Sequence, residues 1–311
     1  MSVELTSKCN LRCEMCSVWK GMRDGVPFER IVGLLHEARG LGAEVFTPSG
    51  AEVFMRKDTP AILEAAAACG FAKISVVTNG MLIARQIDRL ADIPGLALHI
   101  SLDGPEDVHD ALRGPGSYQS AIAGLEAAQG AGIEVSVKAV LMRQTLATAG
   151  HLVGLARRYG LPRISFQPYQ PEIGGPEADH DHWGFDAAAR SEVDAALARL
   201  RDLARQAGVA IHTEGLFPHI VPYLFDGHRP VPPGGCALPA RFLLVDGRGE
   251  VYPCFFMRRQ SMGNVMRGVR LTDIWHGPVQ TKMQHAGAKG ACPGCLAGCS
   301  DVPGFAVPAH A

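Results

Sequence analysis

Three cysteines near the start of the chain are the residues best suited to chemistry. Cys9, Cys13 and Cys16 follow a short apolar run with the spacing C-x3-C-x2-C, so one tight loop carries three thiols. A structural zinc site is closed by four ligands, and no fourth ligand lies nearby in the sequence. Three thiolates can instead bind three irons of a [4Fe–4S] cluster and leave the fourth iron open. The spacing therefore favours iron–sulfur chemistry over zinc, or over three unrelated buried thiols.

The cysteine triplet resembles the signature of the radical S-adenosylmethionine (SAM) superfamily. In that superfamily SAM binds the open iron and is split into methionine and a 5′-deoxyadenosyl radical, which removes hydrogen from a carbon that no ordinary base could deprotonate. The resemblance implies SAM and a [4Fe–4S] cluster as cofactors, with Cys9, Cys13 and Cys16 as ligands. It also implies an electron donor such as flavodoxin or ferredoxin.

A second stretch matches the superfamily after the next expected strand. Ser49-Gly50-Ala51-Glu52 stands where relatives have a Gly-Gly-Glu-Pro turn that binds the SAM amino group, although Ser49 replaces the first glycine and Val53 the proline. At this turn Gly50 would allow close approach of the backbone, and Glu52 would accept hydrogen bonds from the ammonium. The alternative for Glu52 is a solvated loop carboxylate.

Polar residues at later strand ends extend the expected SAM site. Parallel α/β sheets bind ligands at the carboxyl ends of their strands. The Thr-Asn-Gly and Ser-Leu-Asp-Gly stretches there match superfamily patterns, although both are also common turn formers. The resemblance implies contacts with SAM or substrate for Thr78, Asn79, Ser101, Asp103 and Lys138. Lys138 is alternatively a core lysine whose ammonium reaches solvent.

Five more cysteines lie near the C-terminus: Cys236, Cys254, Cys292, Cys295 and Cys299. Their spacing resembles the SPASM/Twitch extension of radical SAM enzymes and implies an auxiliary [4Fe–4S] cluster; a zinc ribbon is the rival interpretation. The triplet Cys292, Cys295 and Cys299 would supply three ligands and either Cys236 or Cys254 the fourth; with Cys236 as the ligand, Cys254 is the spare thiol. In Twitch-type relatives the hairpin cysteines and the Cys-x2-Cys pair are all ligands, and Cys299 would then be spare.

Alternating strand and helix patterns predict an α/β fold. Nearly continuous apolar runs indicate parallel strands covered on both faces, and several of the intervening helices end at glycine. The expected strands are residues 3–5, 44–47, 74–78, 96–101, 134–141 and 163–167, and the expected helices are 28–39, 58–69, 84–90, 117–130, 146–159 and 187–206. Periodicity alone leaves a doubly wound sheet and a partial barrel open. The resemblance implies a partial (β/α)6 radical SAM barrel over residues 1–215.

Two further segments are expected outside the repeating units. Residues 170–185 form a long polar loop that would act as a lid or contact substrate. A small cysteine-rich auxiliary-cluster domain is expected over residues 216–311, with a hairpin formed by 242–245 and 251–255.

The charge balance and the lengths of the apolar runs argue against nucleic acids and membranes as partners. The 311 residues include 30 basic and 31 acidic side chains, so no net field would attract nucleic acid or an anionic membrane. No apolar run approaches the roughly 20 residues that span a bilayer, and the N-terminus lacks a signal sequence, which predicts a cytoplasmic protein. Thiols stay reduced in that compartment, so the nine cysteines are expected to be metal ligands rather than disulfides.

The substrate expected from the sequence is a small molecule. Cys9 follows almost directly after Met1, which leaves no room for an upstream peptide-recognition domain, and the acidic stretch 172–181 would suit a polyamino sugar. The short architecture resembles aminoglycoside-modifying members, the neomycin epimerase and the butirosin aminocyclitol dehydrogenase, and so implies antibiotic biosynthesis. Epimerisation, with the Cys254 thiol returning hydrogen to the substrate radical, is favoured. The alternatives are dehydrogenation of a secondary alcohol, with the auxiliary cluster accepting an electron, and radical modification of a ribosomal peptide.

Overall fold

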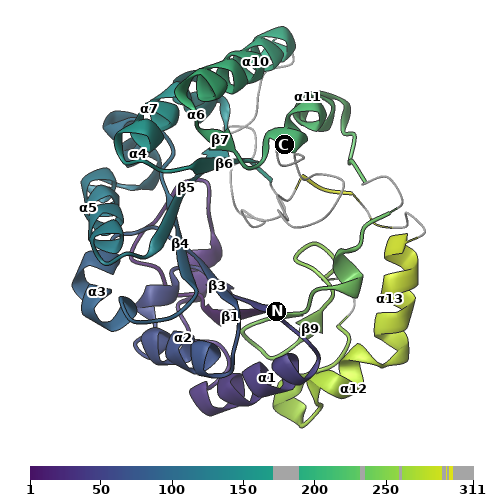
Figure 1. Ribbon diagram of the computed structural model, residues 1–311. Coiled ribbons are helices and arrows are strands. Elements are labelled where there is room, and N and C mark those ends of the chain that lie inside the picture. The colour runs from purple at the N-terminus through teal and green to yellow at the C-terminus, as the bar shows by residue number, and fades with distance from the viewer. Residues whose placement is uncertain (171–188, 232–234, 259–260, 289–291, 293, 297–311) are drawn as a thin grey trace.

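The computed structural model describes residues 1–170, 189–231, 235–258, 261–288, 292 and 294–296. A nine-stranded sheet forms its centre, with helices along the outer side (Figure 1). Six strands are those that the sequence predicts: β1 Ser2–Thr6, β2 Val45–Gly50, β3 Lys73–Thr78, β4 Leu96–Ser101, β5 Glu134–Leu141 and β6 Arg163–Pro168. The predicted polar loop at 170–185 lies, apart from its first residue, outside the described residues.

The order of the strands distinguishes a barrel from a doubly wound sheet. Strands β1 to β6 lie in chain order, and each neighbouring pair is parallel. A doubly wound sheet reverses its strand order at a switch point and carries helices on both faces. Here the strands form an arc with α1, α2, α3, α5 and α7 outside it (Figure 1). The predicted partial barrel is therefore confirmed.

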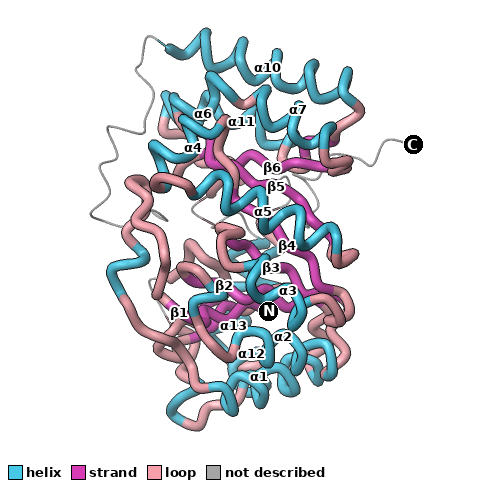
Figure 2. The backbone as a smooth tube through the Cα atoms, turned by 90° about the vertical axis from the view of Figure 1, so that its left-hand side faces the viewer, coloured by secondary structure: helices cyan, strands magenta, loops and turns pink. Residues whose placement is uncertain are grey.

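The helices follow the expected alternation, with one divided helix and several described helices outside the six predicted ranges. They are α1 Phe28–Gly40, α2 Thr59–Ala68, α3 Ile83–Leu90, α4 Glu106–Arg113, α5 Ser117–Gly130, α6 Arg143–Thr148, α7 Gly150–Arg158, α10 Arg190–Ala207, α11 Phe217–Asp226, α12 Leu271–Trp275 and α13 Pro278–Ala288. The single helix predicted over 146–159 is divided at Ala149, which follows α6 and precedes α7. The sequence does not predict α4, whose apolar pair is only Val108 and Leu112, or α11, which contains Pro222. Figure 2 shows the helical layer from α1 to α10.

The two faces of the curved sheet differ, which corrects the expectation of apolar packing on both. Leu98 and Val137 are fully buried in the core between sheet and helices. At the intervening positions, which face the inside of the arc, His99 bonds Ser75 Oγ through Nε2 at 2.8 Å and Ser136 Oγ through Nδ1 at 2.6 Å. Imidazole and hydroxyl groups from three neighbouring strands therefore line part of the interior.

His99 should make the stability of the barrel sensitive to acid. Burial, and secondarily the nearby Lys138, lowers its pKa from 6.5 to about 3. Between these values the folded protein holds a neutral imidazole, whereas the unfolded chain binds a proton. The free energy of unfolding should therefore fall as the pH drops from about 6.5 towards 3, by up to about 1.4 kcal/mol per pH unit for this group. Urea unfolding at about pH 7 and about pH 5 should give a shallower dependence for His99→Gln, and equal slopes in the two proteins would refute this role.

The C-terminal part extends the sheet beyond β1. Strand β8 (Leu244–Val245) pairs in parallel with β1, and β9 (Val251–Tyr252) pairs antiparallel with β8, which confirms the predicted hairpin. At the start of α12 the N–H of Leu271 donates to Glu37 of α1 at 2.6 Å. Strand β7 (Ala210–Ile211) extends the opposite edge beside β6. The domain boundary near residue 215 stays a prediction.

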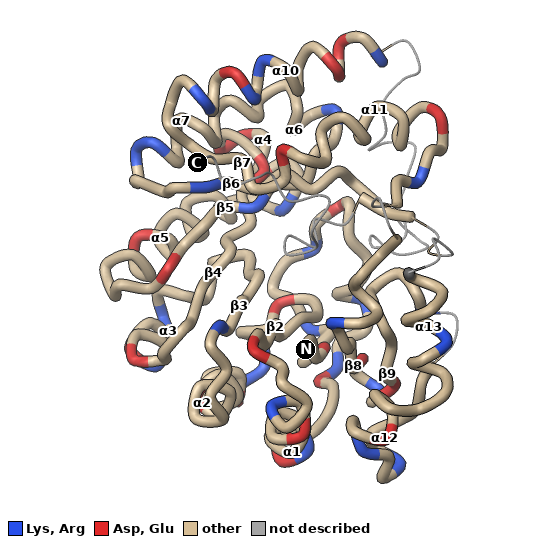
Figure 3. The backbone as a smooth tube through the Cα atoms, turned by 45° about the vertical axis from the view of Figure 1, so that its right-hand side comes forward, with Lys and Arg blue, Asp and Glu red and all other residues tan. Residues whose placement is uncertain are grey.

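Charged residues of both signs are interspersed along the outer helices, as α1 and α10 show (Figure 3). Within the described ranges, no helix has the length and apolar character needed to cross a membrane.

Candidate active site

The loop after β1 carries Cys9, Cys13 and Cys16 at the carboxyl edge of the sheet. The backbone N–H of Leu11 donates to Cys9 Sγ at 3.4 Å, and the N–H of Cys16 donates to the carbonyl of Cys13 at 3.1 Å. All three side chains are half-buried free thiols. The loop therefore holds three partly accessible sulfurs on an ordered backbone.

Two neighbouring elements anchor this loop. Asn79, directly after β3, donates from Nδ2 to Asn10 Oδ1 at 2.8 Å. The backbone N–H of Glu14 donates to the carbonyl of Leu112 in α4 at 3.1 Å. Asn79, one of the predicted site residues, thus links the end of β3 to the cysteine loop.

The electrostatic surroundings of the loop suit a metal cluster. Burial raises the pKa of Cys9 and raises that of Cys13 to about 11, and the neighbouring thiols add to both shifts. Such thiols keep their protons near neutral pH unless a bound metal ion supplies positive charge, in which case the thiol ionises. Like a bound metal ion, the guanidinium of Arg113 favours the thiolate, because it lowers the pKa of Cys13.

The three thiols are interpreted as ligands of a cluster rather than of a single metal ion. In the part of the chain that the structure describes, no three histidine, cysteine, aspartate or glutamate side chains form a site for a single metal ion. A [4Fe–4S] cluster is held differently, since each thiolate binds a different iron. Three half-buried thiols on one loop beside a buried cation therefore fit such a cluster.

Glu52 lies beneath the loop and is only 1% exposed, so the alternative of a solvated carboxylate is wrong. Its carboxylate accepts hydrogen bonds from the N–H of Phe54 at 3.2 Å, from Thr78 Oγ1 at 2.9 Å and from the N–H of Asn79 at 2.8 Å. Burial raises the pKa of Glu52, while these three donors oppose the shift. Glu52 thus joins the ends of β2 and β3, and its contact with the SAM ammonium stays a prediction.

Gly50 is required by the close approach of β2 to β1. Its φ of +128° lies in the region that favours glycine, and a Cβ at this position would meet the carbonyl oxygen of Thr6. Its neighbour Ser49 shares a hydrogen bond of 2.9 Å with Ser2 Oγ across the same strand pair. Strand β1 therefore accommodates a serine at position 49, where the superfamily pattern has its first glycine.

Asp103 is fully buried and paired with a cation that the sequence analysis missed. Its Oδ2 accepts from Arg113 Nε at 2.5 Å, and its Oδ1 accepts from the N–H of Val140 at 2.9 Å. Burial is the largest single influence on the pKa of Arg113 and lowers it. Asp103, Cys13 and Cys16 together outweigh burial, so the pKa is raised overall. Arg113 lies at the end of α4, so recognition of that helix would have been the signal for it. Asp103 therefore positions a guanidinium beside the cysteine loop.

Ser101 and Lys138 lie opposite each other in the β4–β5 register, and both are half-buried. On the same inner face, they lie two residues further along β4 and β5 than His99 and Ser136, which are hydrogen-bonded to each other. The structure therefore brings these two predicted residues together on the inner face. Their contacts with SAM or substrate stay predictions.

Gln170, two residues beyond β6, is a buried polar side chain that the sequence analysis did not single out. It is 3% exposed, and among the described residues neither its amide nitrogen nor its amide oxygen has a hydrogen-bond partner. Leaving such a group unpaired costs about 1–3 kcal/mol. Its position at the carboxyl edge makes it a candidate contact for a bound ligand.

Four cysteines of the C-terminal part form a second group of thiols. Cys236 and Cys292 share a hydrogen bond that lowers the pKa of Cys292 to about 6 and raises that of Cys236. Cys236 also interacts with Cys295, and Cys254 with Cys292. Cys299 lies outside the described residues. The choice between Cys254 as a cluster ligand, the Twitch-type alternative, and Cys254 as a spare hydrogen donor stays a prediction.

Cys254→Ala tests this choice. If Cys254 is a ligand, the variant should lose about four irons per chain, one cluster, while dithionite still supports SAM cleavage at the N-terminal cluster. Anaerobic iron and sulfide analysis with quantification of 5′-deoxyadenosine measures both. Retention of all the iron with loss of product would restore the hydrogen-donor role.

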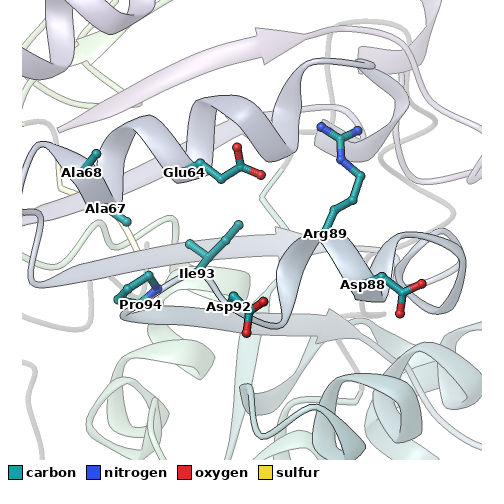
Figure 4. A pocket seen from close by; sticks show the side chains of 8 residues that line it. All are labelled: Glu64, Ala67, Ala68, Asp88, Arg89, Asp92, Ile93 and Pro94. Carbon is teal, nitrogen blue, oxygen red and sulfur yellow. The ribbon is translucent and has the colours of Figure 1, made fainter.

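A surface groove lies apart from both thiol groups. It runs between α2 and the C-terminal end of α3 on the outer side of the sheet, lined by Glu64, Asp88, Arg89, Asp92 and apolar residues (Figure 4). None of the predicted site residues lines it, so the site at the carboxyl edge does not depend on this groove.

A thiol triplet at the carboxyl edge of a partial barrel, with a second thiol group in a C-terminal extension, defines a class of enzymes that combine SAM with iron–sulfur clusters. The chain matches the radical SAM superfamily over residues 3–156 and the SPASM iron-sulfur cluster-binding domain over residues 236–299. It is a radical SAM protein with a SPASM domain. Its cofactors are SAM and [4Fe–4S] clusters, one in the radical SAM site and one auxiliary.

Relatives and solved structures agree with this assignment. Mycofactocin maturase MftC of Mycobacterium tuberculosis is 28% identical over 312 residues, which cover 95% of this chain and 76% of the relative. Fe-coproporphyrin III synthase of Methanosarcina barkeri is 27% identical over 298 residues, 87% of this chain and 72% of the relative. The structure of Streptococcus suis SuiB bound to precursor peptide SuiA has a TM-score of 0.71 at 18% identity, covering 91% of this chain and 66% of that chain. Native anSMEcpe with bound AdoMet has a TM-score of 0.69 at 16% identity, covering 92% and 82%.

Proposed function

We propose that the protein is a peptide maturase, in which a SAM-derived radical removes a hydrogen atom from a carbon of a ribosomally made peptide. The observation that carries the proposal is the similarity to mycofactocin maturase along 95% of the chain. Structures of the same fold with peptides bound, SuiB with SuiA and anSMEcpe with Cp18Cys, support it by showing that this architecture admits a peptide.

The expected aminoglycoside epimerase has no such support. The relatives named above are a maturase and a porphyrin synthase, and neither epimerisation nor dehydrogenation is indicated by their names. In the Twitch-type alternative, Cys254 would be a cluster ligand and so would not be free to return hydrogen to the substrate radical.

The residues of this chain would have two roles: some hold the cysteine loop in place, and others contact the substrate from the inner face of the sheet. When bound, the N-terminal cluster and SAM supply the radical. Glu52 and Asn79 hold the ends of β2 and β3 against the cysteine loop, and Asp103 holds Arg113 beside it. Ser101 and Lys138, on the inner face, offer a hydroxyl and an ammonium to polar groups of the substrate.

Co-expression with a short peptide encoded beside the gene tests the proposal. The peptide isolated with the active protein should differ in mass from the peptide isolated with Cys13→Ser, which keeps the loop but cannot hold the cluster normally. A peptide of unchanged mass in both cultures, despite SAM cleavage by the purified protein, would count against peptide modification.

Modification of a tetrapyrrole is the second candidate. It is favoured by the similarity to Fe-coproporphyrin III synthase and to pre-heme d1 synthase of Dinoroseobacter shibae, which is 25% identical over 321 residues. Incubation of the cluster-loaded protein with SAM, dithionite and a panel of tetrapyrrole precursors of heme distinguishes the two. A modified tetrapyrrole detected by mass spectrometry would replace the peptide proposal, and unchanged tetrapyrroles would leave the peptide as substrate.

A further inference from the structure

The outer side of the cysteine loop exposes a mixed basic and apolar surface. Met22 is 51% exposed and Val18 is 38% exposed, two of only a few large hydrophobic side chains in the described residues that reach this level. The exposed side chains of Arg12, Lys20 and Arg23 surround them. We call the exposed residues of this segment, together with Trp19, the 12–23 surface.

Trp19 connects this surface to the expected cluster ligands. Its Nε1–H donates to the carbonyl of Cys16 at 2.7 Å. The guanidinium of Arg12 lies 4.7 Å from the centre of the indole ring and donates from Nη1 to the carbonyl of Cys9 at 2.8 Å. The stacked pair is thus hydrogen-bonded to the backbone of two cluster cysteines, while Arg12 reaches solvent.

The local charge differs in sign from that of the whole chain. Residues 8–24 contain four basic side chains and two acidic ones, Glu14 and Asp24, which gives +2 on a chain of net charge −1. Asp24 is already paired with Lys8 at 2.6 Å. Arg12, Lys20 and Arg23 therefore present a positive field that would attract an acidic partner and repel a basic one.

We propose that the 12–23 surface docks a small acidic one-electron carrier protein, which delivers the electron that SAM cleavage consumes. The proposal rests on the proposed radical function, because that reaction needs one electron for each SAM. The carrier is oxidised by one electron, the N-terminal cluster receives it, and SAM takes it up when its sulfur–carbon bond breaks. Through Trp19 and Arg12, the surface is hydrogen-bonded to the backbone carbonyls of Cys16 and Cys9.

The composition of the surface fits a short-lived complex. Trp, Met and Arg are enriched in the cores of protein interfaces, and charged residues at the rim increase the rate of association. Complexes of electron-transfer proteins bury little area, and a surface built from a single loop of about a dozen residues is sufficient for one.

Charge reversal at two positions tests the proposal on the intact, cluster-loaded protein. Lys20→Glu/Arg23→Glu removes the positive field without touching a cysteine, Trp19 or Arg12. Arg157→Glu/Arg199→Glu is the matched control, because these arginines are exposed on α7 and α10, towards the β7 edge of the sheet and away from β1. The probe is a purified flavodoxin, used oxidised for binding and as its hydroquinone for activity.

Binding of oxidised flavodoxin, measured by calorimetry, should weaken about tenfold or more in Lys20→Glu/Arg23→Glu and stay unchanged in the control pair. Raising the salt concentration should weaken binding to the wild type and reduce the difference. SAM cleavage driven by flavodoxin hydroquinone should fall in parallel, whereas cleavage driven by dithionite should be equal in all three proteins.

Equal binding by the surface variant and the wild type, or no binding by the wild type, would overturn the docking proposal. Failure of the proposed function gives a different result: the co-expressed peptide would keep its mass, or dithionite would not support SAM cleavage even in the wild type. The binding comparison would still decide whether the 12–23 surface docks the carrier.

Discussion

Replacing Cys13 by alanine should abolish reductive SAM cleavage and lower the iron content from about eight to about four atoms per chain. Cys13 is the central thiol of the loop, and burial raises its pKa to about 11, so only a bound cluster would hold it as a thiolate. Without it the cluster keeps two protein ligands on the loop and should be lost. Production of 5′-deoxyadenosine with dithionite, and iron and sulfide analysis, measure the two effects.

Cys69→Ala is the matched control for this variant. Cys69 is a half-buried free thiol at the end of α2, beside His36 and outside both thiol groups. Its removal should leave iron content and SAM cleavage unchanged. Loss of iron from Cys69→Ala, or full SAM cleavage by Cys13→Ala, would contradict the assignment of the N-terminal loop.

The largest expected effect on stability follows from the buried pair of Asp103 and Arg113. Arg113→Met should lower the free energy of unfolding by about 3–5 kcal/mol, because it leaves the fully buried Asp103 carboxylate without its cation. The double variant Asp103→Asn/Arg113→Met should recover much of this loss, since no uncompensated charge then remains. Urea unfolding of the single and double variants measures the difference.

An exposed pair provides the comparison. Arg190 and Asp226 are as close, at 2.6 Å, but both are solvent-exposed, so Arg190→Met should change stability far less than Arg113→Met. Similar losses for the two variants, or a double variant at Asp103 and Arg113 that is as unstable as the single one, would show that the buried pair does not act through charge compensation.

The elements that the sequence predicts well carry strong local signals. The six barrel strands are apolar runs bounded by glycine or polar turns, and the cysteine loop is recognisable because three thiols are spaced too closely for chance. Chain-order pairing of these strands could not be predicted from periodicity, because strand order depends on how the intervening helices pack.

The roles that the sequence did not reveal belong to residues without a local sequence signal. Arg113 depends on α4, a short helix with too few apolar positions to give a periodic signal, and its partner Asp103 lies ten residues away. Gln170 is an ordinary loop residue in the sequence, and only its burial without a hydrogen-bond partner distinguishes it. Cys254 was assigned by counting thiols, whereas its electrostatic interaction with Cys292 depends on the folded arrangement of the C-terminal part.

The faces of the strands illustrate the same limit. His99, Ser75 and Ser136 interrupt apolar strands that otherwise indicate burial on both sides. Their hydrogen bonds across β3, β4 and β5 show that they form one polar group on the inside of the arc. A sequence shows that each strand contains a polar residue but not that the three meet.

The central claim is that the N-terminal thiols bind a cluster that cleaves SAM. Its most direct test is to reconstitute the wild-type protein anaerobically, determine iron, sulfide and zinc, and incubate the same sample with SAM and dithionite. We expect about eight irons per chain and formation of 5′-deoxyadenosine and methionine. Tightly bound zinc without iron, or a full complement of iron that leaves SAM intact, would contradict it.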